Sequence, residues 1–244
     1  MEGLIERYKT AAKNHGFRWD TFGEQGPYPL FSLTKRSAGI KPRIYLSSGI
    51  HGDEPAPPLT LLHLLESGFF SDQATWFICP LLNPQGLILG TRESPAKADL
   101  NRAFKEVIEP ETRAHVAWLS RQPNFHLTFC VHEDWEAKGF YLYELNPNNK
   151  PSLAETMLQA ARNHGPIDHS PVIDGREAHL GIIRPDTNPE NRELWPESIY
   201  LLARHHSGIH YTLETASAFE LTQRVETMAA VISAATHAFK RVRA

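Results

Sequence analysis

The sequence predicts an α/β fold, a single domain with a mixed, mainly parallel central sheet flanked by helices. Short apolar runs of strand character alternate with segments of helical periodicity, and this alternation is typical of crossovers between parallel strands. The chain has 244 residues, of which 41% are hydrophobic and 22% charged, which suits one domain with a substantial core. We therefore expect one domain over residues 1–244.

Local signals set the expected boundaries of the elements. The expected elements are helices over 1–15, 57–66, 111–120, 152–163 and 221–242, and strands over 17–22, 30–35, 44–50, 75–82, 127–131, 140–145 and 208–215. The first helix has charged residues between apolar positions and ends near Gly16, and Pro57 suits the first turn of the second. Ser152 and Glu155 form a capping box for the helix that Gly165 ends.

Glycine and proline mark the connections. The strands 17–22 and 30–35 flank a glycine-containing turn and are expected to pair as a hairpin. We interpret 83–104 as a loop rich in ligand-type residues, and 166–200 as irregular structure over one sheet edge near the active site. In the last helix one face is apolar, formed by Val225, Met228, Ala229, Ile232, Ala235 and Phe239.

Composition argues against several classes of partner. The net charge is −3 and the basic residues are scattered, apart from a small group near the C-terminus, so nucleic acid is not an expected partner. Cys79 and Cys130 each lie in an apolar run, which predicts reduced core thiols. No apolar run reaches membrane-spanning length, and residues 1–15 lack the apolar core of a signal peptide. We expect a cytoplasmic protein without a membrane partner.

The segment His51-Gly-Asp-Glu54 is a candidate metal site. It follows the strand 44–50, and Pro55 biases Glu54 away from helical geometry, which favours a turn. An imidazole and a carboxylate at this spacing can close on one cation, and one more protein ligand would complete a catalytic zinc site with an open position. The alternative at this point is an exposed pair on a helix surface.

Further ligand-type side chains follow the other predicted strands. In open α/β sheets, residues beyond the carboxyl ends of parallel strands converge in space. The residues in such positions are Arg92, Asp99, Asn101 and Arg102 after 75–82, His132 after 127–131, and Glu214 near the end of 208–215. Each alone has an ordinary explanation as a structural histidine, a turn cap or a surface charge, but together they predict one site.

The motifs resemble the carboxypeptidase A-like zinc peptidases, and most nearly their small bacterial branch, which includes murein peptide amidase and the succinylglutamate desuccinylase/aspartoacylase-like proteins. The motifs, in order from about residue 43 to 225, are His51-Gly-Asp-Glu54, Asn83-Pro-Gln-Gly86 with Gly90-Thr-Arg92, Asp99-Leu-Asn-Arg102, His132, and Thr212-Leu-Glu214-Thr. The resemblance implies a zinc carboxypeptidase-like fold and a single zinc-hydrolase domain over 1–244.

The resemblance also implies roles. His51, Glu54 and His132 would bind one Zn²⁺, which lowers the pKa of bound water and polarises a carbonyl. Glu214 would be the catalytic general base, since that task needs a carboxylate that is not itself a ligand. Arg92 would be the second catalytic residue and would stabilise the oxyanion.

The remaining matched residues point to the substrate. Asn101 and Arg102 would bind a substrate carboxylate, since a guanidinium matches carboxylate geometry. Asp99 would accept the free ring N–H of a zinc-binding histidine. The expected partner is thus a small peptide or acylated amino acid that carries a carboxylate; the sequence leaves its identity and the oligomeric state open.

Other residues keep alternatives open. The run Glu133-Asp134-Trp135 differs from the digestive carboxypeptidases, whose apolar side-chain preference is therefore not carried over. A rival metal site could use His205, His206 and His210, although surface or core roles are favoured for them, and His210 shares strand parity with Glu214. Residues of 166–200 that could contact substrate are Asp174, Arg184 and Tyr200.

The sequence therefore supports three hypotheses. The first is a zinc-dependent hydrolase of the metallocarboxypeptidase or peptide amidase type, a protease-like enzyme that cleaves an amide near a free carboxylate with Glu214 as general base. The second is an N-acyl amino acid deacylase of the succinylglutamate desuccinylase/aspartoacylase type. The third is a non-catalytic zinc-binding relative, against which the presence of Glu214 and Arg92 argues because binding alone needs neither.

Overall fold

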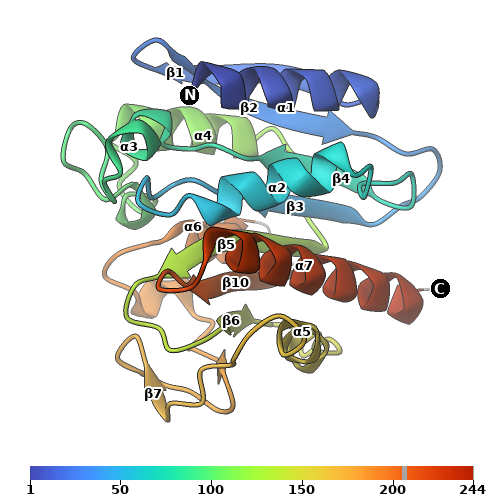
Figure 1. Cartoon of the computed structure of the whole chain (residues 1–244), viewed down its shortest axis with the longest axis vertical. Helices are drawn as coiled ribbons and strands as arrows, with labels where there is room; N and C mark the ends of the chain where they lie inside the picture. The colour runs from blue at the N-terminus through green and yellow to red at the C-terminus, as the bar shows by residue number, and fades with distance from the viewer. Residues whose placement is uncertain (205–207, 244) are drawn as a thin grey trace.

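An eight-stranded mixed sheet forms the centre of the computed structural model, which describes residues 1–204 and 208–243 (Figure 1). The helices are α1 (Glu2–Asn14), α2 (Ala56–Glu66), α3 (Pro84–Leu89), α4 (Pro110–Leu119), α5 (Ala154–Ala161), α6 (Glu197–Arg204) and α7 (Leu221–Arg243), with 3₁₀ turns η1 (Leu100–Arg102) and η2 (Pro189–Asn191). The strands are β1 (Arg18–Gln25), β2 (Tyr28–Lys35), β3 (Arg43–Ser47), β4 (Thr75–Cys79), β5 (Leu127–Asp134), β6 (Tyr141–Leu145), β7 (Val172–Ile173), β8 (Arg176–Glu177), β9 (Ile182–Ile183) and β10 (Ile209–Ala216).

The strand order is β1-β2-β4-β3-β5-β10-β6-β9, and its four central strands are parallel. The hairpin β1–β2 joins this core antiparallel at one edge. At the other edge, β6 runs antiparallel to β10, and β9 runs parallel to β6. The predicted mixed, mainly parallel sheet is confirmed, because the helices between the central strands provide the crossovers that parallel pairing requires.

Helices bury both faces of the sheet. Helices α1, α2, α5 and α7 cover one face, with α2 and α7 crossing in front in Figure 1, and α4 and α6 cover the other. Strand β3 shows why, since Ile44 and Leu46 pack on the first face and Tyr45 on the second, and all three are fully buried. The expected core thiols, Cys79 and Cys130, are both buried and free.

The predicted loop 83–104 contains more regular structure than expected. Helix α3 begins with Asn83 as N-cap, whose side chain accepts from the Gly86 N–H at 3.1 Å, and Pro84 follows at the first helical position. The turn η1 comes later in the same segment. Asparagine followed by proline is a helix-start signal, so this short helix was readable from the sequence.

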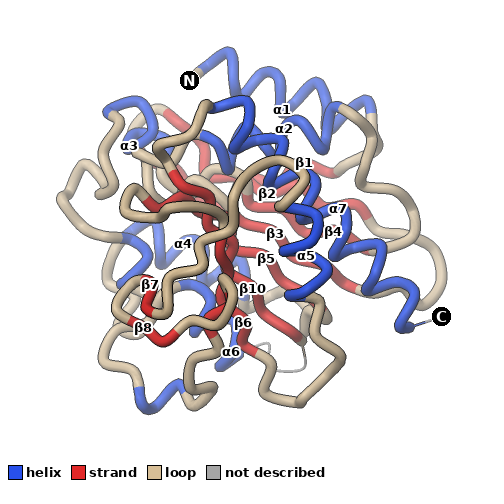
Figure 2. Tube along the Cα trace, turned by 60° about the horizontal axis from the view of Figure 1, so that its bottom comes forward, coloured by secondary structure: helices blue, strands red, loops and turns tan. Residues whose placement is uncertain are grey.

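The segment 166–200 was also expected to be irregular, and this prediction was wrong in part. It contains the hairpin β7–β8, the edge strand β9, the turn η2 and the start of α6; Figure 2 shows the hairpin among the tan loops outside the main sheet. Asp174 and Gly175 both have positive φ, 48° and 65°. These angles belong to a type I′ turn, for which Asp-Gly is a preferred sequence.

The start of α2 is held by a buried ion pair. The backbone N–H of Ala56 donates to Glu133 at 2.9 Å, and the other oxygen of Glu133 pairs with Arg224 on α7. A carboxylate is stabilised at a helix N-terminus because the unpaired N–H groups there carry partial positive charge. Glu133 thus joins β5 to two helices, directly beside His132.

Within residues 1–204 and 208–243, every helix falls short of the length or the apolar character that a bilayer span requires.

We predict that Arg224→Met lowers the free energy of unfolding by about 3 kcal/mol, because it leaves Glu133 charged and buried without its partner. The matched control is Arg7→Met, which removes the exposed pair of Arg7 with Glu66 and should cost less than about 1 kcal/mol. Urea denaturation of both variants measures the difference. Equal losses in the two variants would contradict the structural role of the buried pair.

Candidate metal centre

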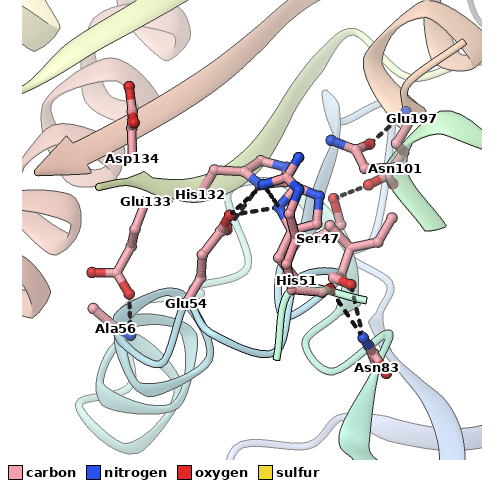
Figure 3. Close-up of polar contacts among 12 residues, drawn as sticks. Ser47, His51, Glu54, Ala56, Asn83, Asn101, His132, Glu133, Asp134 and Glu197 are labelled. Atoms are coloured by element: carbon pink, nitrogen blue, oxygen red, sulfur yellow. Dashed lines mark hydrogen bonds and ion pairs between the residues drawn. The ribbon is translucent and has the colours of Figure 1, made fainter. Parts of the chain in front are cut away.

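Three buried side chains converge where β3 and β5 end. His51 and Glu54 lie in the turn between β3 and α2, and His132 lies on β5; one ligand atom from each is within 4.8 Å of the other two. The Nδ1 atoms of His51 and His132 are 2.5 and 2.9 Å from the two carboxyl oxygens of Glu54. Figure 3 shows the three side chains turned toward one another.

Charges around Glu54 favour its ionised form. Burial raises the pKa of its carboxyl, but the imidazoles of His132 and His51 outweigh burial and lower the pKa to about 2. Two imidazole nitrogens and one carboxylate are a donor set typical of catalytic zinc. The residues present therefore fit a zinc ion with a fourth position open.

Asp99 fixes the ring of His51. One carboxyl oxygen of Asp99 is 3.3 Å from Nε2 of His51, and the other accepts from Nε of Arg92 at 3.0 Å. A hydrogen on Nε2 satisfies this contact and leaves the Nδ1 lone pair directed at the metal position. Asp99 therefore lies within hydrogen-bond distance of both His51 and Arg92.

Gly52 allows the turn to pack against α3. A Cβ atom on Gly52 would lie 1.9 Å from the carbonyl carbon of Gly86, so only glycine fits between these two backbones. The Gly52 N–H also donates to the carbonyl of Thr91 at 2.9 Å. Asn83 reinforces the contact, since its amide donates to the carbonyl of Ile50 at 3.3 Å while it caps α3. The two glycine-containing motifs are therefore in direct contact.

Glu214 and Arg92 reach the same site from other elements. Glu214 lies on β10 in register with His132 on the parallel strand β5, so both side chains lie on the same face of the sheet. Burial raises the pKa of Glu214 well above its usual range. Arg92 follows α3, and its guanidinium nitrogen is 3.8 Å from a carboxyl oxygen of Glu54 and 3.3 Å from Nδ1 of His51.

A cavity of about 750 Å³ opens over these groups. Seven of the eight predicted site residues line it: His51, Glu54, Arg92, Asn101, Arg102, His132 and Glu214. Asn101 is buried, whereas Arg102 is exposed and donates to the Asn101 carbonyl at 3.0 Å. The hairpin β7–β8 contributes Asp174 and Arg176 to another part of the wall. The cavity is large enough for a ligand of several residues or acyl groups.

The other candidates from the sequence are placed differently. His205 and His206 lie outside the described residues. His210 is buried on β10, 3.0 Å from the hydroxyl of Thr128, and is not among the residues that line the cavity. Arg184 pairs with Glu144 and Glu155, and the ring of Tyr200 packs in the core beside Phe104. Of the three candidates in 166–200, Asp174 alone lines the cavity.

Sequence reasoning missed Glu197. This residue begins α6 inside the segment that was expected to be irregular, and it is 1% exposed. It accepts from Tyr45 and Ser47 on β3, and its N–H donates to the side chain of Asn101. The proline before it, Pro196, was the available signal for a helix start.

The fold is similar to that of solved metallopeptidase and metallo-carboxypeptidase structures. A metallopeptidase-type structure from Shewanella amazonensis SB2B superposes with a TM-score of 0.83 at 22% identity and covers 96% of this chain and 91% of its own. A metallo-carboxypeptidase from Burkholderia cenocepacia gives a TM-score of 0.70 at 16% identity, covering 96% of this chain and 69% of its own. A metallo-carboxypeptidase from Pseudomonas aeruginosa in complex with (2-guanidinoethylmercapto)succinic acid gives 0.70 at 15% identity with the same coverage.

The succinylglutamate desuccinylase/aspartoacylase catalytic-domain profile matches residues 40–162, half of the chain. The chain belongs to this family. The matched range contains the turn with His51, the Asp99 segment and His132, and it ends before Glu214. The resemblance drawn from the sequence motifs is confirmed.

We predict that Gly52→Ala weakens zinc binding by about tenfold or more. The new methyl group would push the turn away from α3 and so displace His51 and Glu54, the two candidate ligands in that turn. The loss of stability should be about 1–3 kcal/mol, as for other overpacked sites. Zinc affinity is measured by competition with a chromogenic chelator. Gly3→Ala, where a Cβ has nothing within 4 Å, is the matched control and should leave zinc affinity unchanged.

Proposed function

We propose that this chain is a zinc-dependent hydrolase that cleaves an amide bond next to a free carboxylate, as a metallocarboxypeptidase or peptide amidase does. The observation that carries this proposal is the convergence of His51, Glu54 and His132, with Glu214 on the adjoining strand. The family membership supports a hydrolase of this general kind.

His51, Glu54 and His132 would hold the metal. A zinc ion at this position supplies Lewis acidity and lowers the pKa of bound water to about 7. The buried carboxylate of Glu54 offsets part of the metal's charge. With its ring hydrogen on Nε2 directed at Asp99, His51 would bind the metal through Nδ1.

Glu214 is the proposed general base. It lines the cavity beside His132 but is not part of the three-residue ligand cluster. Its carboxylate would take a proton from the attacking water and pass it to the nitrogen of the leaving amine. Its environment supports this exchange, since a partly desolvated carboxylate accepts a proton more readily than an exposed one.

Arg92 is the proposed oxyanion donor. Its side chain is fixed by Asp99 and faces the ligand cluster, where negative charge develops as the carbonyl is attacked. Asn101 and Arg102 offer amide and guanidinium donors on the same cavity, which suits a substrate carboxylate. The P. aeruginosa relative holds a succinic acid derivative, and this supports a ligand that carries carboxylates here.

The second candidate is an N-acyl amino acid deacylase, which the family profile favours. It would use the same metal ligands and the same base. The two candidates differ in which side of the amide carries the recognised carboxylate. Release of a C-terminal residue from peptides would support the first, whereas cleavage of N-acetyl or N-succinyl amino acids with peptides left intact would support the second.

The proposal is tested with zinc-loaded protein on a panel of peptides with free C-termini and N-acyl amino acids. We predict that Glu214→Gln keeps one equivalent of zinc and lowers kcat by about a hundredfold or more, because it loses the base but no metal ligand. Chelation should abolish the wild-type activity, and added zinc should restore it.

Glu220→Gln is the control for the loss of a carboxylate near the end of β10, and it should keep wild-type turnover. If the zinc-loaded wild type hydrolyses no member of the panel, and Glu214→Gln binds the same ligands with the same affinity, the chain is a non-catalytic zinc-binding relative.

We predict that Arg92→Ala lowers kcat by about a hundredfold, the usual effect of losing an oxyanion donor. Zinc content should stay near one equivalent, because the side chain donates no ligand atom. Kinetics and metal analysis on the same preparation separate these effects. A loss of zinc in parallel with activity would show that Arg92 mainly supports the ligands through Asp99.

A further inference from the structure

The carboxyl group of Glu197 is buried with two hydroxyl donors. Its oxygens accept from Tyr45 at 2.6 Å and from Ser47 at 2.7 Å, both on β3. His115 lies 2.9 Å from the Tyr45 hydroxyl, and since that hydroxyl donates to Glu197, the imidazole N–H donates to Tyr45. Burial lowers the pKa of His115. These bonds fix the first residue of α6 against the strand that leads into the metal-binding turn.

The backbone of Glu197 determines which way the amide of Asn101 faces. The Glu197 N–H is 2.9 Å from the Asn101 side chain, and because an N–H can only donate, the atom it meets must be Oδ1. The amide nitrogen of Asn101 therefore occupies the other position of the planar group. Asn101 is only 7% exposed, yet it lines the cavity. Its donor group thus has a fixed direction.

Burying the carboxyl group of Glu197 costs free energy of folding, and packing alone does not offset that cost. Burial of a carboxyl requires hydrogen bonds to replace water, and an apolar residue of similar volume would often be as stable or more so. What the two hydroxyl bonds add is a defined position for α6 relative to β3. The residue at the end of this chain of contacts is Asn101.

We infer that Glu197 is a positioning residue of the enzyme, which holds the start of α6 so that the Asn101 amide nitrogen donates to the carboxylate of the substrate. This inference rests on the proposed function, in which Asn101 binds that carboxylate. Glu197 does not touch the substrate and acts through its backbone N–H. Its loss should therefore weaken substrate binding more than it slows the chemical step.

The test is a double-mutant cycle with Glu197→Gln and Asn101→Ala on the best substrate of the panel. Each single change should raise KM by about tenfold, the usual effect of a weakened hydrogen bond to a charged group, while kcat changes by less than about threefold. Glu197→Gln should raise KM no further in the Asn101→Ala background, because the two changes remove the same interaction. Zinc content should stay at one equivalent in all variants.

Glu144→Gln is the matched control. Glu144 is also a buried carboxylate that accepts from a tyrosine hydroxyl, that of Tyr211 at 2.8 Å, and from Arg184 at 2.7 Å, but it makes no contact with Asn101. It should lower thermal stability without the change in KM. Ser47→Ala removes one of the two hydroxyl bonds with a smaller perturbation, and it replaces Glu197→Gln if that variant does not fold.

Additive effects of Glu197→Gln and Asn101→Ala, or a rise in KM in Glu144→Gln of the same size, would overturn the inference and reduce Glu197 to a stabilising residue. Failure of the proposed function is a separate result. It would be seen as wild-type protein without hydrolysis, or as Asn101→Ala with an unchanged KM, and either result removes the basis of the inference as well.

Discussion

The parallel pairing of β3, β5 and β10 is the constraint on which the site depends. These strands share one direction, so their carboxyl ends meet at one edge, and residues separated by more than 80 positions become neighbours there. The register between β5 and β10 places Glu214 opposite His132 on one face of the sheet. A shift of the register by one residue would turn one of the two side chains to the other face. The sheet thus places His132, a candidate metal ligand, beside the carboxyl-bearing Glu214, although the two residues are far apart in the sequence.

Three carboxylates lie near this edge of the sheet, and each is in contact with nitrogen atoms of neighbouring groups. Glu54 lies between two imidazoles, Asp99 between His51 and Arg92, and Glu133 between Arg224 and the start of α2. Each carboxylate lies within hydrogen-bond distance of at least two nitrogen atoms, and these contacts restrict the geometry of the groups around it. Side chains that are ordered in this way before a ligand binds reduce the entropic cost of binding it.

The order of elements and the strand-end residues were readable from the sequence, since both follow from periodicity and from the rule that parallel strands end together. The hairpin at Asp174-Gly175 and the helix after Asn83 carried local signals that were overlooked. The environment of Asn101 was not readable. It depends on a backbone N–H 96 positions away, at the start of α6, where the side chain of Glu197 joins that helix to β3.

The β7–β8 hairpin has its own turn, its Ile173 packs in a small apolar cluster with Tyr141 and Ile183 of the main sheet, and its Asp174 is joined to Tyr143 by a hydrogen bond. It forms part of the cavity wall yet supplies none of the three metal-ligand candidates. Substitutions in this hairpin can therefore reshape the cavity while the ligand geometry stays intact. The wall and the candidate ligands are thus carried by separate parts of the fold, so the sequence of the hairpin can change independently of His51, Glu54 and His132.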